Sequence, residues 1–370
     1  MDSRLLIGAM SGTSADGVDA ALVRIGGTGL AMTAELVTHA SAAFDAELRA
    51  RIHTLRATGR VALDELARLG TDLARAYAGV TRQVLAAADL GPTDVVALAA
   101  HGQTLFHAPP LSLQWLDPAY LAWATGIDVI SDFRRADLAA GGQGAPLVPY
   151  ADYVVFRSTS RSRVLLNLGG IANVTWLPKS AGVRDLLAFD TGPGNCLSDW
   201  LMREHSDTGA GVDVGGALAL GGSAFEDVAG YFVEDEYFRR PPPKSTDGPA
   251  MVAAFERALG DRVDAPLTDL LATAALCVAR TVIEGLATCS QGEEFDLIVA
   301  GGGVHNAALI EHLAAFKPVA SDAAGVPAEA REAMAFAILG AATLDREPAN
   351  VIRATGALRP VVLGAITPRP

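Results

Sequence analysis

One local pattern, two apolar runs joined by a turn rich in glycine, occurs twice in this chain. The first copy runs from Leu5 to Ile25 and holds the turn Ser11-Gly12-Thr13-Ser14 near its centre. The second runs from Val164 to Leu177 around Gly169-Gly170. Each copy predicts a strand, a turn whose backbone a ligand can approach closely, and a second strand. Two such hairpins predict an α/β protein of two similar domains that face one another across a cleft.

The first turn has the composition of an anion-binding loop. Backbone N–H groups in such turns form a concave nest, and the hydroxyls of Thr13 and Ser14 add further donors. The segment is not a P-loop, because the pattern G-x-x-x-x-G-K-[ST] is missing and the following element looks like a strand. The sequence therefore favours a phosphate-binding hairpin of the sugar-kinase and actin type, with an ordinary tight hairpin as the alternative.

Composition limits the partners that the chain can bind. Its 370 residues, 50% of them hydrophobic, exceed what one core usually holds, so two domains are expected. A formal net charge of −13 argues against nucleic acid and anionic membranes, because both need clustered Lys and Arg. Cys196, Cys277 and Cys289 are odd in number and lack metal-binding spacing, which fits a reducing compartment. With no signal sequence, and with charges interrupting every long apolar run, we expect a cytoplasmic protein.

Hydrophobic periodicity predicts the remaining elements. Helical spacing predicts helices over Phe44–Arg56, Val61–Ala88, Leu267–Leu286 and Glu329–Leu344. Apolar runs predict strands over Val95–Ala100, Ile127–Ile130, Leu186–Phe189 and Phe295–Ala300, and an edge strand or docking tail at Val361–Gly364. The glycine-rich stretch Leu138–Ala151 favours neither helix nor strand, and we expect it to be a crossover or hinge.

Asp190 is the carboxylate in the best position for chemistry. It follows the predicted strand Leu186–Phe189 and precedes Gly192-Pro193-Gly194, whose bends predict a side chain facing a cleft. A carboxylate in such a place can act as a general base. It can equally cap the helix that starts near Asn195, or order the glycine turn, and the residues alone leave these alternatives open.

Several segments, in order, resemble the anhydro-N-acetylmuramic acid kinase family, which is part of the actin-like ATPase and sugar-kinase superfamily. They are Gly8–Gly17, His101–Thr104, Asp132–Arg135, Ala139–Pro149, Leu166–Asn173, Phe189–Asn195, Pro241–Thr246 and Gly301–Asn306, and the resemblance extends from Leu6 to Pro368. One departure is Asp247-Gly248-Pro249, where the family usually continues with Gly-Arg-Glu. The resemblance implies two ribonuclease-H-like domains, which we place at residues 1–135 with 340–370 and at residues 136–339.

The resemblance also implies an activity. Members of the family use ATP and water to open the ring of 1,6-anhydro-N-acetylmuramic acid and to phosphorylate O6. The products are N-acetylmuramic acid 6-phosphate and ADP, in peptidoglycan recycling. Asp190 would then accept the proton of the attacking water. Mg²⁺ is expected with ATP, the partner is a small amino sugar, and the likeness to the family suggests a homodimer.

Glycine-containing segments are the expected nucleotide contacts. The resemblance implies phosphate contacts at Gly12, Thr13, Ser14, Ala15, Asp16, Gly17, Val18 and Asp19, a second phosphate loop at Gly169, Gly170 and Asn173, and an adenosine loop at Gly301, Gly302 and Gly303. A close helix–strand contact explains the last three glycines nearly as well. Asp16 and Asp19 either orient Mg²⁺ through water or stabilise the turn, and no metal ligand is assigned.

The substrate's lactyl carboxylate and hydroxyls require a cation and polar donors. Arg134 is preferred to Arg135 as the cation, although either one fits a surface ion pair as well. Gln103 and Thr104 are expected to supply polar contacts. Glu332 resembles a substrate-contacting glutamate of the family, and a solvent-facing helix residue is the alternative.

Three further residues have open roles. Lys244 lies in a proline-rich loop, from which it either approaches phosphate or carboxylate or remains solvated. His101 and His107 are six residues apart without a third ligand, so we expect them to be structural.

Two other functions compete with the anhydro-sugar kinase. A kinase for a plain hexose or an acid would keep the phosphate loops but use Asp190 to deprotonate a substrate hydroxyl, with no water consumed. A nucleotide-gated binding module, as in actin or the chaperone ATPases, would open and close for a partner. We expect no added partner-binding domain, which speaks against the second alternative.

Overall fold

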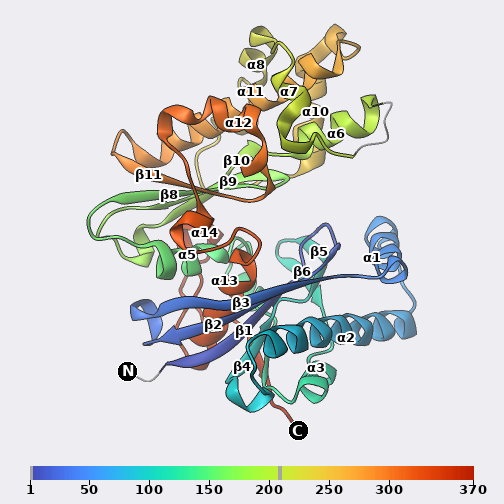
Figure 1. Cartoon of the computed structure of the whole chain (residues 1–370), viewed down its shortest axis with the longest axis vertical. Helices are drawn as coiled ribbons and strands as arrows, with labels where there is room; N and C mark the ends of the chain where they lie inside the picture. The colour runs from blue at the N-terminus through green and yellow to red at the C-terminus, as the bar shows by residue number, and fades with distance from the viewer. Residues whose placement is uncertain (1–2, 207–210) are drawn as a thin grey trace. The chain divides into compact units, whose positions relative to one another are not determined.

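The computed structural model describes residues 3–206 and 211–370, which form two compact units (Figure 1). Unit 1 comprises Met1–Phe156 and Glu329–Pro370, and unit 2 comprises Arg157–Ala328. The chain therefore leaves unit 1 after Phe156 and returns at Glu329. We had placed these transitions at 135/136 and 339/340, so the structure shifts both boundaries.

Unit 1 is built on a six-stranded sheet with the order β13-β7-β4-β1-β2-β3. β1, β2 and β3 form an antiparallel meander, β4 and β7 run parallel to β1, and β13 pairs antiparallel with β7. The hairpin of β5 and β6 is separate from this sheet. The strands are β1 (Arg4–Met10), β2 (Gly17–Gly26), β3 (Thr33–Ala43), β4 (Ala97–Ala100), β5 (Gln103–Ala108), β6 (Leu111–Trp115), β7 (Val129–Ser131) and β13 (Ala365–Thr367).

The helices of unit 1 pack around this sheet. α2 contacts β2 and β3, while α13 contacts β1, β2 and β4 and also packs on α5. Gly8 on β1 permits the contact with α13, because a β-carbon there would lie 1.9 Å from the carbonyl oxygen of Ala333. The helices are α1 (Ala46–Thr58), α2 (Leu63–Ala87), α3 (Pro118–Thr125), α4 (Arg135–Ala139), α5 (Val148–Phe156), α13 (Arg331–Leu344) and α14 (Ile352–Thr355).

Unit 2 repeats the same core topology. Its five-stranded sheet has the order β10-β9-β8-β11-β12, with an antiparallel meander of β8, β9 and β10 and with β11 and β12 parallel to β8. The strands are β8 (Ser162–Leu168), β9 (Ile171–Leu177), β10 (Leu187–Pro193), β11 (Phe295–Ala300) and β12 (Val319–Ala320). Each unit thus contains a ribonuclease-H-like sheet, and the predicted duplication of an α/β core is confirmed.

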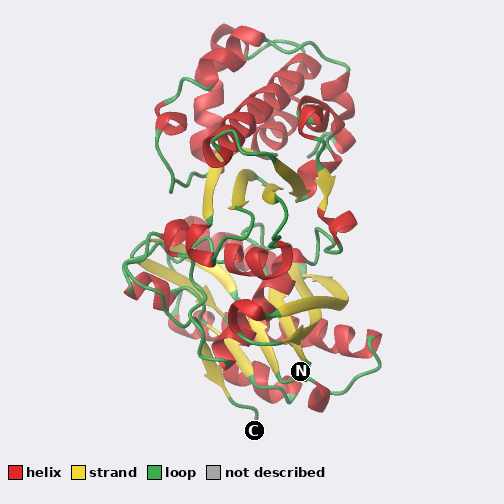
Figure 2. Ribbon diagram, turned by 90° about the vertical axis from the view of Figure 1, so that its left-hand side faces the viewer, coloured by secondary structure: helices red, strands yellow, loops and turns green. Residues whose placement is uncertain are grey.

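Helices cover the sheet of unit 2, as the ribbon coloured by secondary structure shows (Figure 2). α11 is the central one, and the side chains of its apolar face join β8, β9 and β10 in one hydrophobic core. It is the one helix in the described residues that is long and apolar enough to cross a membrane, but most of it is buried. The helices are α6 (Cys196–His205), α7 (Ala217–Leu220), α8 (Glu226–Phe232), α9 (Glu236–Arg239), α10 (Gly248–Leu259), α11 (Leu267–Ser290) and α12 (Ala307–His312).

The glycine-rich stretch Leu138–Ala151 differs from its expectation. Its last part is helical and begins α5, and the whole stretch lies inside unit 1, so it does not link the two units. The buried Asp137 fixes it: the carboxylate accepts hydrogen bonds from Gly144 N at 2.8 Å and from Asn350 Nδ2 and Thr355 Oγ1 at 2.7 Å each. The C-terminal residues therefore hold this stretch in place.

The end of the chain also differs from its expectation. We had predicted an edge strand or docking tail at Val361–Gly364, whereas the edge strand β13 begins one residue later, at Ala365. The helices and strands predicted from periodicity are present, with ends that differ by a few residues.

A buried ion pair within unit 1 joins α5 to α13. The Arg331 guanidinium donates to both carboxylate oxygens of Asp152, at 2.8 and 2.7 Å from one nitrogen, and the two side chains are 9% and 3% exposed. Breaking a buried ion pair by removing one partner is strongly destabilising.

We predict that Arg331→Met lowers the free energy of unfolding by about 3–5 kcal/mol, because it removes one partner of a buried ion pair. Denaturant-induced unfolding measures this loss. Arg161→Met is the matched control, since Arg161 forms an exposed pair with Asp296 and should cost about 0–1 kcal/mol. Equal losses in the two variants would contradict the prediction.

Candidate functional site

The loop between β1 and β2 is the first part of the candidate site. It spans Ser11 to Asp16 and turns at Gly12, whose carbonyl accepts a hydrogen bond from Ala15 N at 3.2 Å. Thr13, Ser14 and Asp16 are exposed, whereas Ala15 is buried. Phe44 N donates to the Asp16 carbonyl at 2.9 Å, which ties the end of the loop to the segment after β3.

The expected phosphate residues thus divide into two groups. Gly17, Val18 and Asp19 belong to β2 rather than to the loop. Gly17 is needed for packing, because a β-carbon there would lie 2.3 Å from the Ala42 carbonyl oxygen. A β-carbon at Gly12 would meet only Ser14 Oγ, at 3.7 Å, so packing does not require a glycine there. An open glycine in an exposed turn fits the close approach of a ligand.

A buried polar network holds this loop in position. Ser11 Oγ donates to Gln103 Oε1 at 2.7 Å, and Gln103 Nε2 donates to the Gly12 carbonyl at 3.1 Å. Both side chains are almost fully buried. The buried Tyr77 hydroxyl lies close to the backbone N–H groups of Gly102 and Ser11. It forms a hydrogen bond of good geometry with neither group. Gln103 therefore contacts the loop, whereas we had expected it to contact substrate.

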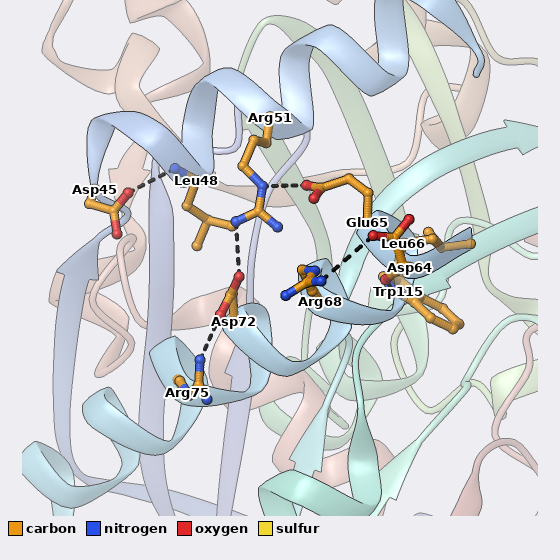
Figure 3. A network of polar contacts seen from close by, with 10 residues as sticks. All are labelled: Asp45, Leu48, Arg51, Asp64, Glu65, Leu66, Arg68, Asp72, Arg75 and Trp115. Carbon is orange, nitrogen blue, oxygen red and sulfur yellow. Dashed lines mark hydrogen bonds and ion pairs between the residues drawn. The ribbon is translucent and has the colours of Figure 1, made fainter. Parts of the chain in front are cut away.

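Helix α1 brings two arginines to the same loop. Arg49 forms an ion pair with Asp16 at 2.9 Å, and the Arg56 guanidinium donates to the Thr13 carbonyl. Arg51 anchors α1 on α2, since it donates to Glu65 at 2.6 Å and to Asp72 at 2.9 Å (Figure 3). Sequence reasoning missed this contribution, although arginines on the helix that follows β2 and β3 were the signal.

His101 and Arg134 form a second polar cluster in unit 1. Arg134 Nε donates to His101 Nε2 at 3.0 Å, so His101 Nδ1 carries the proton that is donated to the Gly102 carbonyl at 2.9 Å. Burial, and secondly the charge of Arg134, hold the pKa of His101 well below its usual range. His101 is thus neutral and orients Arg134, as expected for a structural histidine.

Glu332 lies near the same cluster, although we had assigned it to the other domain. It is in the first turn of α13, hence in unit 1, and it interacts electrostatically with Arg134 and with Asp19. Burial raises the pKa of the Glu332 carboxyl even though water reaches the side chain. Protein therefore surrounds the carboxylate on most sides, while the side chain as a whole stays in contact with solvent. Burial also lowers the pKa of Arg134, to about 10, which leaves it charged at neutral pH.

The remaining candidates of unit 1 have other partners. Arg135 is exposed and pairs with Asp132 at 2.5 Å, which supports the choice of Arg134 over Arg135. Thr104 Oγ1 accepts from Gln114 Nε2 at 3.3 Å within the β5–β6 hairpin. His107 Nδ1 lies 2.8 Å from Ser112 Oγ. Among residues 3–206 and 211–370, no three His, Cys, Asp or Glu side chains are grouped as metal ligands.

In unit 2, polar side chains cross the sheet in a row. Asn173 on β9 is paired with Asn167 on β8 and with Asp190 on β10. Directly opposed residues of an antiparallel sheet lie on the same face, with their β-carbons about 4.5–5.5 Å apart. The structure therefore brings Asp190 and Asn173 together. It adds Asn167, which sequence reasoning overlooked although an amide in an apolar strand was a signal.

Asp190 itself is fixed through its backbone and its carboxylate. A β-bulge follows it in β10, and its N–H donates to the Lys244 carbonyl at 3.0 Å. Its Oδ2 accepts from Thr246 N at 3.0 Å, and its carbonyl accepts from the Tyr237 hydroxyl at 2.7 Å. The half-buried carboxyl has a pKa of about 6, raised by burial and lowered in part by the Thr246 hydrogen bond.

The alternative roles weighed for Asp190 are not those seen. The N-cap of α6 is Asn195, and no side-chain hydrogen bond caps this helix. The contacts of the Asp190 carboxylate go to the segment 244–246 and not to the glycine turn. A carboxylate that neither caps a helix nor pairs with a cation is available for proton transfer.

In unit 2 the turn Gly169-Gly170 follows β8 and contacts the start of α6. Carbonyls of Gly169 and Gly170 accept hydrogen bonds from Asn195 N at 2.8 Å and from Cys196 N at 3.1 Å, at the start of α6. A β-carbon at Gly170 would meet nothing within 4 Å, so this glycine leaves open space at the turn. The second expected phosphate loop thus has room for a ligand.

The expected adenosine loop contains glycines of two kinds. β-Carbons at Gly301 and Gly303 would lie 2.8 Å and 2.6 Å from atoms of Leu168, so close packing explains both. A β-carbon at Gly302 would meet only Asn195 Nδ2, at 3.7 Å. The packing alternative therefore accounts for two of the three glycines, and Gly302 is the open one.

The chain is similar to known proteins over nearly its whole length. The sequence model of the family "Anhydro-N-acetylmuramic acid kinase" matches residues 4–369. The anhydro-N-acetylmuramic acid kinase of Salinibacter ruber is 41% identical over 387 residues, covering 98% of this chain and 96% of the relative. That of Bordetella pertussis is 42% identical over 374 residues, covering 99% and 96%. The activator of 2-hydroxyisocaproyl-CoA dehydratase from Clostridium difficile, solved with bound ADPNP, is 12% identical with a TM-score of 0.47, covering 91% of this chain and 94% of that one.

The duplicated ribonuclease-H-like units and the full-length match define the class: the chain is an ATP-using kinase, an enzyme that transfers phosphate to an alcohol group. The chain belongs to the anhydro-N-acetylmuramic acid kinase family. The predicted family is therefore confirmed.

We predict that Gln103→Leu weakens ATP binding about tenfold, because it removes both Gln103 hydrogen bonds to the Ser11–Gly12 segment and takes away the partner of the buried Ser11 hydroxyl. Titration calorimetry with a non-hydrolysable ATP analogue measures the change. Gln114→Leu is the matched control, since Gln114 bonds only within its own hairpin. Unchanged affinity in Gln103→Leu would show that the loop does not need this support.

Proposed function

We propose that this kinase opens the 1,6-anhydro ring of 1,6-anhydro-N-acetylmuramic acid with water and phosphorylates O6. The products would be N-acetylmuramic acid 6-phosphate and ADP, formed in the cytoplasm during peptidoglycan recycling. The observation that carries the proposal is the setting of Asp190, a half-buried carboxylate on an edge strand that has no cationic partner among the described residues. Membership of the family supports the identity of the sugar.

The chemistry requires one base. Water forms a bond to C1 while the C1–O6 bond breaks, and O6 forms a bond to the γ-phosphorus as the bond to ADP breaks. The proton of the water passes to Asp190. Because the phosphoryl group captures O6 directly, no separate acid is needed there. A carboxylate with a pKa of about 6 is deprotonated at neutral pH yet is a stronger base than an ordinary aspartate.

The open turn at Gly12 in unit 1 and the open turn at Gly170 in unit 2 are each a candidate phosphate contact. Exposed Thr13 and Ser14 would add hydroxyl donors, and phosphoryl transfer depends mainly on such positioning and on charge neutralisation. Mg²⁺ would neutralise part of the phosphate charge when it is bound with ATP. Asp19, which accepts from Ser41 Oγ at 2.5 Å, fits a role in holding it through water, because Mg²⁺ keeps several waters.

The sugar would be recognised by the cluster around Arg134. Its guanidinium, oriented by His101, suits the lactyl carboxylate, and Glu332 would accept hydrogen bonds from sugar groups. Thr104 stays a candidate polar contact. Gln103 would act through the loop that it supports.

The reaction itself tests the proposal. Incubation with ATP, Mg²⁺ and the anhydro sugar in ¹⁸O-labelled water should place the label at C1 of a 6-phosphorylated product. Mass spectrometry with fragmentation locates the label. Product without label, or turnover only with ordinary hexoses, would favour the simple hexose kinase instead.

We predict that Asp190→Asn lowers kcat by about 10²–10⁴-fold, as expected for loss of a general base, while ATP still binds. Steady-state kinetics and analogue binding measure the two effects. Asp296→Asn removes the same charge from an exposed ion pair of unit 2 and should leave kcat unchanged. Near wild-type turnover by Asp190→Asn would exclude it as the base.

The raised pKa of Asp190 also sets the pH dependence. A base works only when deprotonated, so a pKa of about 6 predicts that kcat falls about tenfold per pH unit below pH 6 and is level above it. An ordinary aspartate would keep its activity down to about pH 4. A pH–rate profile between pH 4 and 8 distinguishes these outcomes.

A further inference from the structure

Lys244, whose role the sequence left open, has its ammonium group bound within unit 2. Its Nζ donates to the carbonyl of Phe238 at 2.9 Å and to that of Tyr237 at 3.3 Å, at the end of α9. The same ammonium group lies over the Tyr237 ring, 4.8 Å from its centroid. A cation that meets the last carbonyls of a helix, and also an aromatic face, is held firmly.

The residues that hold Lys244 also contact the proposed base. The Tyr237 hydroxyl donates to the Asp190 carbonyl at 2.7 Å, so Tyr237 binds Lys244 through its ring and carbonyl and binds Asp190 through its hydroxyl. The Lys244 carbonyl accepts from Asp190 N at 3.0 Å. Two residues further along, Thr246 N donates to Asp190 Oδ2 at 3.0 Å. All of these residues lie in unit 2.

We infer that Lys244 is a positioning residue: with Tyr237 it fixes the segment Lys244–Thr246 against α9, so that the Thr246 N–H group is aimed at the Asp190 carboxylate. The inference rests on the proposed function only in treating Asp190 as the base. It assigns the proline-rich segment 241–246 to the support of that base and not to direct contact with phosphate or sugar.

The groups around Asp190 and Lys244 determine how the position of the segment Lys244–Thr246 affects the pKa of Asp190. The Thr246 hydrogen bond stabilises the charged carboxylate and so lowers the pKa of Asp190, against the effect of burial. The charged groups that act on Lys244 are Glu284 of α11 and Arg240 after α9, and the Asp190 charge acts on Tyr237. Releasing the segment therefore removes a donor from the carboxylate and moves the pKa of Asp190 upward.

Lys244→Met keeps an unbranched side chain, one atom shorter than lysine, but removes its charge and donors. We expect the acidic limb of the pH–rate profile to move upward by about one pH unit, the size of one hydrogen bond to a charged group. kcat should then fall about fivefold at pH 6 and stay near the wild-type value at pH 8, with the KM for ATP unchanged. Lys179→Met, which alters an exposed lysine of the same unit, should change neither quantity.

A direct role for Lys244 gives the opposite pattern. If its ammonium group bound phosphate or the lactyl carboxylate, Lys244→Met would raise the KM for ATP or for the sugar at every pH and leave the acidic limb in place. That result would overturn the inference.

Tyr237→Phe is the milder variant, should Lys244→Met fold poorly. It keeps the ring beneath Lys244 and removes only the hydroxyl that binds the Asp190 carbonyl. We expect a smaller shift of the acidic limb in the same direction. Because both changes release one segment, their shifts in the double variant should be less than additive. No shift in either single variant would contradict the inference.

A titration independent of turnover separates this inference from the proposed function. The carboxyl resonance of Asp190 in ¹³C-aspartate-labelled protein is identified by its loss in Asp190→Asn, and its pKa is then measured in the wild type and in Lys244→Met. A higher pKa in Lys244→Met supports the positioning role, even if the pH–rate profile shows that another group is the base. An unchanged pKa overturns it.

Discussion

The contact between the backbones of β1 and α13 is the constraint on which unit 1 depends. At Gly8 there is no room for a side chain, because a β-carbon would lie 1.9 Å from the Ala333 carbonyl oxygen. The contact joins the first strand of the chain to a helix formed after the chain has returned from unit 2. As a result, the charge of Asp19 on β2 helps to raise the pKa of Glu332 in the first turn of α13. The buried pair of Arg331 and Asp152 fixes the same helix against α5.

The two sheets place their polar groups by the same topological means. In each unit a meander of three antiparallel strands carries a glycine turn after its first strand, and the further strands run parallel to that first strand. Unit 2 adds a row of side chains across its meander, which ends at Asp190 on the edge strand. An edge strand leaves one side of the base without a neighbouring strand. On that side lies the segment 244–246, from which Thr246 N donates a hydrogen bond to the Asp190 carboxylate.

Most of the fold was predictable because its signals are local. The apolar runs and the helical periodicity predicted the strands and helices, and the repeated strand–turn–strand pattern predicted the duplication. The structure divides the chain after Phe156 and at Glu329 rather than at 135/136 and 339/340, and the glycines after residue 135 belong to a fixed segment rather than to a hinge. Asp137 accepts three hydrogen bonds there, two of them from residues more than two hundred positions later. No local pattern reports such partners.

The candidate site, like the fold, could be predicted from the sequence only where its signals are local. Its motifs named the residues around the base and the turns, and the structure brings Asp190 to Asn173 and Arg134 near Glu332. The motifs did not reveal that Gln103 supports the Ser11–Gly12 loop, that His101 orients Arg134, or that Lys244 binds the end of α9.

The sequence by itself thus determined the family, the repeated α/β core and the residue types available for chemistry, since these follow from order and periodicity along the chain. Only the tertiary structure decided which polar groups support another residue. The reason is that a hydrogen bond depends on distance and direction between atoms brought together by packing.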